Sequence, residues 1–249
     1  QSIVETTQGE DILAAADRVL SPTPIYYTEN YGIGKHPASF AKYANAKYGI
    51  DVKRGVVWRL SNDGITPISE YYQHIYFTDL CKKIMLSSAP VKIYGVFDIR
   101  FGEYIISVEG FTYTGIFVPP QTIAFNEKSN EWSTHYSVHP ENFVGNGVNV
   151  IAFKNGQLWK QNSNPIQNNF FGVQYASEVH SVCNANPSNV KILEAISEEC
   201  NDVWEAPEIT TENGQKTNLI EADFQEKENM QYAALWRDEN TVNVPTPLI

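Results

Sequence analysis

The chain has 249 residues, of which 42% are hydrophobic and 12% aromatic, and it carries a formal net charge of −11. This composition supports a folded core and excludes a wholly disordered chain, and the length allows one large β domain or two ordinary domains. Residues 194–240 hold 13 acidic and 3 basic side chains, whereas residues 1–193 are nearly neutral. An acidic chain without a basic patch is a poor ligand for phosphate groups, so specific nucleic-acid binding is disfavoured.

Residues 1–38 are predicted to form a helix and a connecting segment. Residues 10–20 have an acidic first turn, an alanine-rich middle and a stop at Ser21-Pro22, which is typical of a short helix. The first residue is Gln1 and not methionine, so we expect the chain to begin inside a longer polypeptide, whose remaining N-terminal part would be one of its partners.

Residues 39–184 are predicted to form propeller-like β hairpins and blades. A hairpin turn is expected at Asn62-Asp63-Gly64, and a second helix over residues 71–86 interrupts the strands. Further hairpins are expected from residues 121–125 with 131–137, and from 148–153 with 157–161.

The last two hairpins repeat one sequence pattern. Ile123-Ala124-Phe125 precedes Trp132, and Ile151-Ala152-Phe153 precedes Trp159. Recurring hairpins with aromatic anchors are typical of propeller blades of roughly 40–50 residues each. The region has room for about three such blades, whereas closed propellers need about four to eight. The others would come from the rest of the polypeptide, or else these are stacked hairpins in an open sheet.

Residues 185–240 are predicted to form a small acidic β domain, followed by an extended tail over residues 241–249. Residues 190–197 suit a strand or a short helix, residues 224–228 a charged loop, and residues 231–237 a last strand. The fold class is therefore mainly β, with incomplete propeller-like blades, two short helices and a small acidic β domain.

Neither the cysteines nor the histidines have the spacing of a metal site. Cys81, Cys183 and Cys200 fit neither a disulfide framework nor a CxxC pair. His135 and His139 would lie ~13 Å apart on a strand, too far to share one ion. The remaining histidines have no Cys or Asp at ligand spacing; these are His36, His74 and His180. We expect no metal and no cofactor.

The strongest candidates for catalysis are Asp98 and Glu103, which flank a predicted hairpin turn. A pair of carboxylates suits glycoside hydrolysis, but carboxylates in turns are usually solvated, so we assign no catalytic residue. Residues 61–64 faintly resemble the Asp-box turn of sialidase propellers, which is itself structural. Common nucleophile, phosphate-binding and metalloprotease motifs are missing. The sequence therefore predicts a protein that is not an enzyme, and no apolar run reaches the roughly 18 residues of a membrane helix.

Several strings resemble large structural proteins of crAss-like bacteriophages. The resemblance is closest to the tail muzzle (nozzle-tip) family and covers about residues 45–240. It is carried by fold-defining turns and strands in residues 54–69, 122–132, 153–160, 171–175 and 221–228.

The resemblance implies a virion structural protein in the tail nozzle of a short-tailed phage. The family's role implies a homo-oligomeric ring that closes or lines the exit channel, with other copies of the chain and neighbouring tail proteins as partners. The alternative is a carbohydrate- or receptor-binding β-propeller module, with or without glycan hydrolase activity, because the 14 Tyr, 12 Phe and 5 Trp could stack on sugars. In the first case we expect the acidic domain to face solvent or the channel, where it would repel passing DNA.

Overall fold

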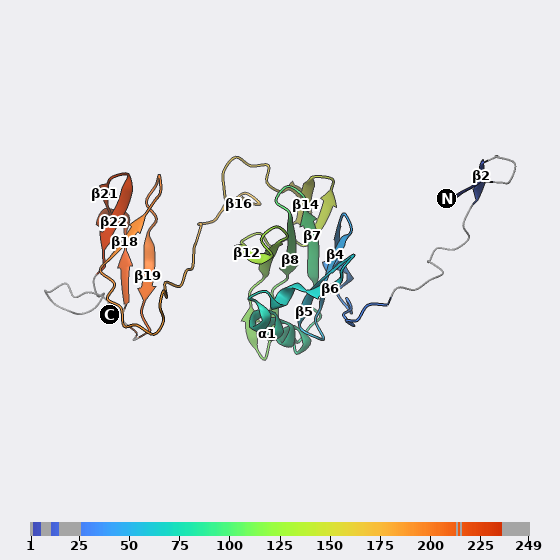
Figure 1. Ribbon diagram of the computed structural model, residues 1–249, viewed down its shortest axis with the longest axis horizontal. Coiled ribbons are helices and arrows are strands. Elements are labelled where there is room, and N and C mark those ends of the chain that lie inside the picture. Colours follow the sequence, from blue (N-terminus) through green and yellow to red (C-terminus); the bar gives the residue numbers. More distant parts are fainter. Residues whose placement is uncertain (1, 6–10, 15–25, 213, 215, 236–249) are drawn as a thin grey trace. The chain divides into compact units, whose positions relative to one another are not determined.

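The computed structural model describes residues 2–5, 11–14, 26–212, 214 and 216–235 (Figure 1). The chain divides into two compact units, Gln1–Glu178 and Val179–Ile249. The boundary that the sequence suggests, after residue 184, stays a prediction. No helix among the described residues is long and apolar enough to span a membrane.

The first described element is a strand pair and not a helix. Strand β1 (Ser2–Glu5) pairs antiparallel with β2 (Asp11–Ala14). The helix predicted over residues 10–20 is therefore wrong for residues 11–14, which form a strand. Residues 10 and 15–20 lie outside the described residues. Helix propensity differs by less than about 1 kcal/mol between ordinary residues, so a ladder of backbone hydrogen bonds to a partner strand overrides it.

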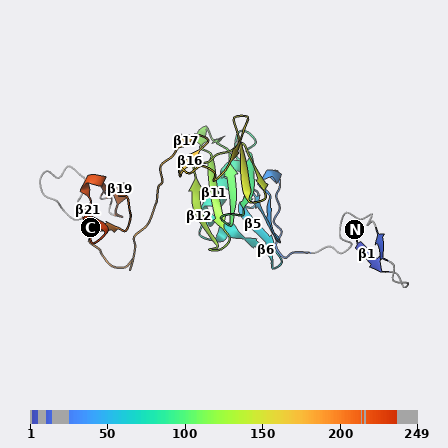
Figure 2. The same cartoon turned by 90° about the horizontal axis from the view of Figure 1, so that it is seen from above.

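Three antiparallel sheets make up the body of unit 1 (Figures 1 and 2). The first sheet has the order β3-β4-β5-β6, with strands Ala41–Tyr43, Ala46–Asp51, Val56–Ser61 and Gly64–Pro67. The second has the order β12-β11-β8-β7, with β7 Ile93–Asp98, β8 Glu103–Val108, β11 Gln121–Asn126 and β12 Glu131–Tyr136. The third has the order β13-β14-β15, with strands Asn142–Asn146, Asn149–Lys154 and Gln157–Lys160. The hairpins predicted at Asn62-Asp63-Gly64 and over residues 121–137 and 148–161 are confirmed.

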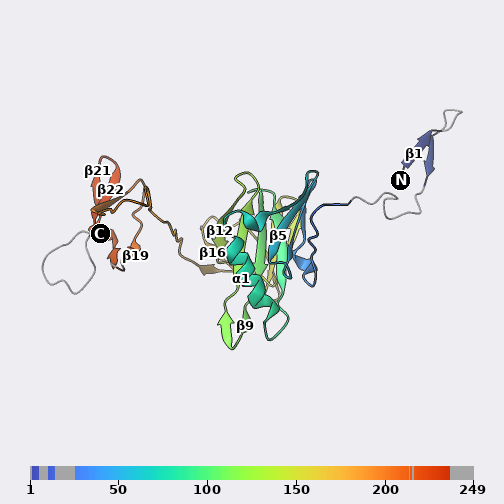
Figure 3. The ribbon, with the colours of Figure 1, turned by 60° about the horizontal axis from the view of Figure 1, so that its bottom comes forward.

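The smaller elements of unit 1 lie before, between and after the strands of these sheets. Helix α1 (His74–Met85) confirms the helix expected over residues 71–86, and it buries Phe77, Leu80, Cys81 and Ile84 at the spacing of one helical face. The hairpin of β9 (Phe111–Tyr113) and β10 (Ile116–Val118) projects beyond the end of α1 (Figure 3). The remaining elements are the 3₁₀ helices η1 (Pro37–Ser39) and η2 (Ile68–Glu70), and the pair β16 (Asn169–Phe170) and β17 (Val173–Gln174).

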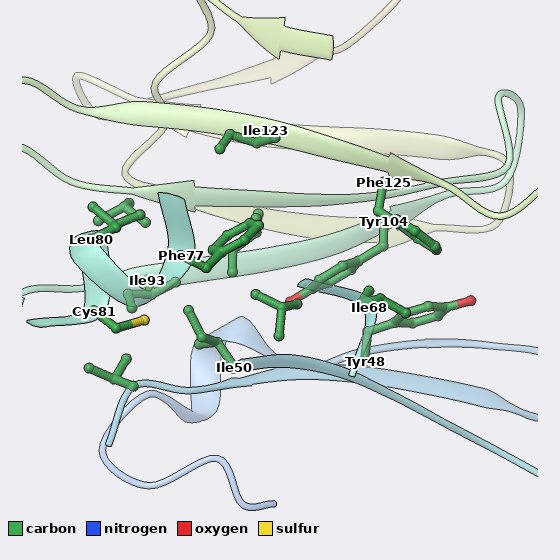
Figure 4. Close-up of a cluster of buried hydrophobic side chains, with 14 of the residues drawn as sticks. Tyr48, Ile50, Ile68, Phe77, Leu80, Cys81, Ile93, Tyr104, Ile123 and Phe125 are labelled. Carbon is green, nitrogen blue, oxygen red and sulfur yellow. The ribbon is translucent and has the colours of Figure 1, made fainter. Parts of the chain in front are cut away.

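The main hydrophobic core lies between the first sheet, the second sheet and α1 (Figure 4). Tyr48 of β4 stacks on Tyr104 of β8 with the ring centroids 4.9 Å apart, and Phe77 of α1 packs on Trp132 of β12 at 4.6 Å. These aromatic contacts add packing energy to the burial of apolar area.

A second core fills the space between the second and third sheets. It holds Tyr94, Val96, Ile105 and Ala124 of the second sheet and Phe143, Val150 and Ala152 of the third. The second sheet is therefore covered on both faces, which explains why all six residues of β8 are buried.

The mainly β fold class is confirmed, whereas the propeller-like arrangement is not. In the described part of unit 1 the sheets are stacked and do not close into a barrel or propeller. Only one α-helix, α1, is present among the described residues, where two helices were expected. The propeller stays a prediction that would require additional blades.

Unit 2 contains a three-stranded and a two-stranded antiparallel sheet around a small core. Their orders are β18-β22-β21 and β19-β20, with strands β18 Ala195–Glu198, β19 Ala206–Thr210, β20 Lys216–Leu219, β21 Gln225–Lys227 and β22 Met230–Ala234. The 3₁₀ helix η3 (Glu221–Asp223) precedes β21. The charged loop predicted over residues 224–228 is wrong for its middle, because Gln225–Lys227 pair with β22. Buried Leu219, Ala233 and Leu235 form the centre of the core.

Candidate functional site

The two carboxylates that the sequence singled out lie side by side. Asp98 ends β7 and Glu103 begins β8, and the two are direct partners across the antiparallel ladder. Side chains of direct partners lie on the same face of a sheet. Asp98 is 2% exposed and Glu103 is 7% exposed, so the expectation that they are solvated turn residues is wrong.

Donors from several segments surround these carboxylates. The Arg100 backbone N–H donates to Asp98 Oδ1 at 2.9 Å, and Asn162 Nδ2 donates to Asp98 Oδ2 at 3.0 Å. The Tyr136 hydroxyl donates to Glu103 Oε2 at 3.0 Å, and Ser133 Oγ donates to Glu103 Oε1 at 3.3 Å. Burial, followed by the charge of Glu103, raises the pKa of Tyr136 above its ordinary value, so this hydroxyl keeps its proton and serves as a donor.

Each oxygen of both carboxylates therefore accepts a hydrogen bond, which is how buried polar groups are accommodated in a stable fold. The bonds tie the β7–β8 hairpin to β12 and to the segment that follows β15. The arrangement supports a structural role for the pair.

A second polar cluster joins the first sheet to the turn between β11 and β12. The Tyr48 hydroxyl donates to Glu127 Oε1 at 2.6 Å, and Arg59 Nε donates to the same oxygen at 2.5 Å. Burial, followed by the hydrogen bond to Glu127, raises the pKa of Tyr48 above its ordinary value. These two hydrogen bonds connect the first sheet to the second sheet.

The histidines lie in unrelated surroundings. His135 is an exposed residue of β12, and its ring packs edge-on against the ring of Tyr76, with the ring centroids 6.0 Å apart. His139 Nδ1 lies 3.2 Å from Thr122 Oγ1. Among the described residues no group of three or more His, Cys, Asp or Glu side chains could hold a metal ion. The turn at Asn62-Asp63 joins paired residues Ser61 and Gly64 and is a structural hairpin.

The outer face of the third sheet carries several apolar side chains that the described residues of unit 1 leave partly exposed. Its inner face carries the buried Phe143, Val150 and Ala152. The opposite, outer face carries Val144, Ile151, Phe153 and Leu158, because Val144 pairs with Ile151 and Phe153 pairs with Leu158. Val144 is 45% exposed, Phe153 37% and Leu158 68%.

Sequence reasoning missed this face, although β14 contains a signal for it. Residues 150–153 read Val-Ile-Ala-Phe, so apolar side chains point to both faces of the strand. Such a continuous apolar run is typical of a strand buried on both sides. The described residues of unit 1 fully bury only one side of this strand, at Val150 and Ala152.

Exposed apolar side chains also lie in the segment that crosses the boundary between the two units. Every residue from 176 to 190 is exposed, and residues 176–192 contain no helix or strand. Val179 is 74% exposed, Val182 91% and Val190 90%. We call residues 176–192 the exposed segment.

One protein family matches this chain. Residues 165–238 match the family described as the Crassvirus muzzle protein C-terminal domain, and no curated protein matches the chain. The match begins after β15 and includes the exposed segment and the described strands of unit 2. It confirms the resemblance of the sequence to tail muzzle proteins. Residues 165–238 therefore match the C-terminal domain of crassvirus tail muzzle proteins, which supports a phage structural protein located in the tail of the virion.

Proposed function

We propose that the chain is a component of the tail nozzle of a short-tailed phage, in which copies of it form a ring that closes or lines the exit channel. The observation that carries this proposal is the match of residues 165–238 to the muzzle protein C-terminal domain. The structural use of Asp98 and Glu103 supports a role without catalysis, since their oxygens are engaged in holding the fold together.

The exposed apolar surfaces support assembly. A ring subunit needs interfaces that bury apolar area against its neighbours. The outer face of the third sheet and the exposed segment provide such area. If a neighbouring subunit covers side chains such as Leu158 and Val182, their burial stabilises the assembly.

The charge of unit 2 supports a position facing solvent or the channel. Most of its carboxylates are exposed, among them Glu199, Asp202, Glu205, Glu221 and Glu228. Such a surface attracts no polyanion and instead repels it. Acidic side chains around a channel would let DNA pass without binding it.

The proposal assigns three kinds of partner: other copies of the chain, neighbouring tail proteins and the remaining N-terminal part of the polypeptide. Native mass spectrometry of tails released from virions tests it. We expect a subassembly with several copies of this chain, joined to tail proteins by cross-links. A single copy per tail, or recovery of the chain only with capsid proteins, would contradict the proposal.

A further inference from the structure

The hairpin of β9 and β10 projects from one corner of unit 1. Ile116 pairs with Tyr113 across the turn at Thr114-Gly115, and both turn residues have positive φ, as a type I′ turn requires. The outer edge of β9 is bridged at Tyr113 by Ser87, which lies two residues after the end of α1. Figure 3 shows the hairpin extending past the end of α1. A tight turn and a bridge to the helix end therefore hold the tip of the hairpin in its projecting position.

The tip of this hairpin and the adjoining end of α1 are apolar and exposed. Ile116 and Phe117 of β10 are each more than half exposed, and so are Met85 and Leu86 at the end of α1. The Phe117 ring lies over the backbone of Gly110, where a Cβ atom would be only 2.9 Å from it, so the ring is supported in its exposed position. We call the four exposed side chains the hairpin corner; they are Met85, Leu86, Ile116 and Phe117.

The charges around the hairpin corner are slightly positive. Helix α1 and the base of the hairpin carry three lysines, Lys82, Lys83 and Lys92, and two carboxylates, Asp79 and Glu109. Lys83 pairs with Asp79 at 2.6 Å, and Glu109 Oε1 accepts a hydrogen bond from the Lys92 backbone N–H. Lys82 and Lys92 are exposed and make no salt bridge among the described residues. In a chain with a net charge of −11, this corner can approach an anionic surface.

These features fit the surface of a lipid bilayer better than a protein partner. Four side chains of this size expose on the order of 500 Å², which is less than the ~800 Å² per partner of a stable protein interface. Residues 110–120 contain no charged side chain that could pair with a partner. A bilayer needs no complementary pocket, because its interface accepts a projecting apolar tip, and anionic headgroups attract lysines close behind that tip.

We propose that the hairpin corner inserts into the interfacial region of a lipid bilayer that carries anionic headgroups. Ile116 and Phe117 enter the boundary between headgroups and acyl chains, to a depth of about 5–10 Å. Lys82 and Lys92 remain among the phosphates of the headgroups. The contact is peripheral, and it goes beyond the proposed ring without depending on it.

Flotation of the full chain with lipid vesicles tests the contact. We expect the chain to float with vesicles of phosphatidylcholine and phosphatidylglycerol in equal parts, and less with phosphatidylcholine alone. Phe117→Ser should lower the partition coefficient roughly tenfold, because an aromatic side chain no longer leaves water. The matched control is Ile75→Ser, which removes an exposed apolar side chain about 15 Å along α1 from Met85 and should bind like the parent. Equal losses in the two variants, or a parent chain that floats with neither vesicle, would overturn the proposal.

A fluorescent label gives an independent readout of insertion. Phe117→Cys and Ile75→Cys, each combined with Cys183→Ser and Cys200→Ser, carry an environment-sensitive dye, and Cys81 is fully buried and stays unlabelled. On addition of the anionic vesicles, we expect the emission of the dye at residue 117 to shift to shorter wavelength. Lipids brominated on their acyl chains should quench it, and the dye at residue 75 should show neither effect. Equal shifts at both positions would contradict insertion through the hairpin corner.

A contact between copies at the same corner would give a different result. Sedimentation velocity without vesicles would then show association that Phe117→Ser weakens, and the parent chain would not float. That outcome would assign the hairpin corner to a protein interface and overturn the proposal. Equal melting temperatures of the parent and the variants would show that all of them are folded. Failure of vesicle binding would leave the proposed ring intact, because the ring is tested separately by the number of copies in tail subassemblies.

Discussion

A Cβ atom on Gly95 would collide with the backbone oxygen of Ser39. This close approach brings η1 against β7 of the second sheet, and the same Ser39 oxygen accepts a hydrogen bond from the Tyr104 hydroxyl at 2.6 Å. The Ser39 side chain is fully buried. Two layers of unit 1 thus meet at a position where only glycine fits.

Replacing Gly95 by alanine should destabilise unit 1 strongly. The backbone of Ser39 must move away, which costs about 2–4 kcal/mol in a packed interior. Urea denaturation followed by tryptophan fluorescence measures the loss. Gly145→Ala is the matched control, because its Cβ would meet Val96 at an ordinary 3.6 Å, and its stability should change by less than about 1 kcal/mol. Equal stability of the two variants would show that the contact is not rigid.

The cluster of Tyr48, Arg59 and Glu127 should behave as one unit in mutational cycles. Tyr48→Phe removes one of the two bonds to Glu127 and should cost about 1 kcal/mol. Glu127→Ala removes both acceptor contacts and should cost about 1–3 kcal/mol, because it leaves the buried Tyr48 hydroxyl and the partly buried Arg59 guanidinium without this acceptor. The double variant should cost less than the sum of the two, measured by denaturation. Simple additivity would mean that the cluster does not couple the layers.

Asp51 should make unit 1 sensitive to acid. Burial opposes its ionisation, but hydrogen bonds from the Gly32 N–H at 3.0 Å and from Arg54 outweigh this, so the pKa of Asp51 lies below its ordinary value. Its contribution to stability is therefore fully present above the unfolded pKa of about 3.9 and is lost as the pH falls through the folded pKa.

The measurement is the free energy of unfolding between neutral pH and about pH 2. Asp51→Asn should be less stable than the parent near neutrality, and the difference should shrink toward acid. Asp63→Asn, at an exposed turn, serves as the control and should run parallel to the parent. A constant difference for Asp51→Asn at every pH would contradict the assignment.

The cysteines should differ sharply in reactivity. Burial, followed by the charge of Asp51, raises the pKa of Cys81 to about 12, whereas Cys183 is exposed. Because the thiolate is the reactive form, alkylation at pH 8 should modify Cys183 in the folded protein and Cys81 only after unfolding. Peptide mass spectrometry over time measures both rates. Alkylation of Cys81 as fast as Cys183 would show that the α1 region opens readily.

Local features of the sequence predicted the hairpins well. Asn62-Asp63-Gly64 and the turn before Gln157 determine their strand pairs through short-range backbone geometry, which does not depend on the remainder of the fold. The helix over residues 71–86 was also predictable, because its apolar face has helical spacing. The strand Asp11–Ala14 was not, because its structure depends on pairing with Ser2–Glu5.

The repeated Ile-Ala-Phe pattern shows why the layers could not be predicted. Trp132 pairs with Phe125 next to a register shift, whereas Trp159 pairs with Ala152. Direct partners share a face, so the first tryptophan packs on the side of its phenylalanine and the second on the opposite side from Phe153. The tryptophan stands seven positions after the phenylalanine in the first hairpin and six in the second, so it lies on opposite faces in the two hairpins, and similar strings do not form equivalent hairpins.

The buried carboxylates depended on contacts that are distant in the sequence. Asp98 is satisfied by Asn162 and Glu103 by Tyr136, partners that only the tertiary fold brings near. From the sequence alone, a carboxylate beside a turn is most simply read as solvated. The apolar outer face around Leu158 likewise required knowledge of which side of β14 the second sheet covers.

Electron cryomicroscopy of the tail tip of intact virions tests the central claim most directly. The account predicts several copies of this chain arranged as a ring around the channel axis, with the third sheet of each copy in contact with a neighbour. Density showing isolated copies away from the channel, with the outer face of the third sheet open to solvent, would contradict it.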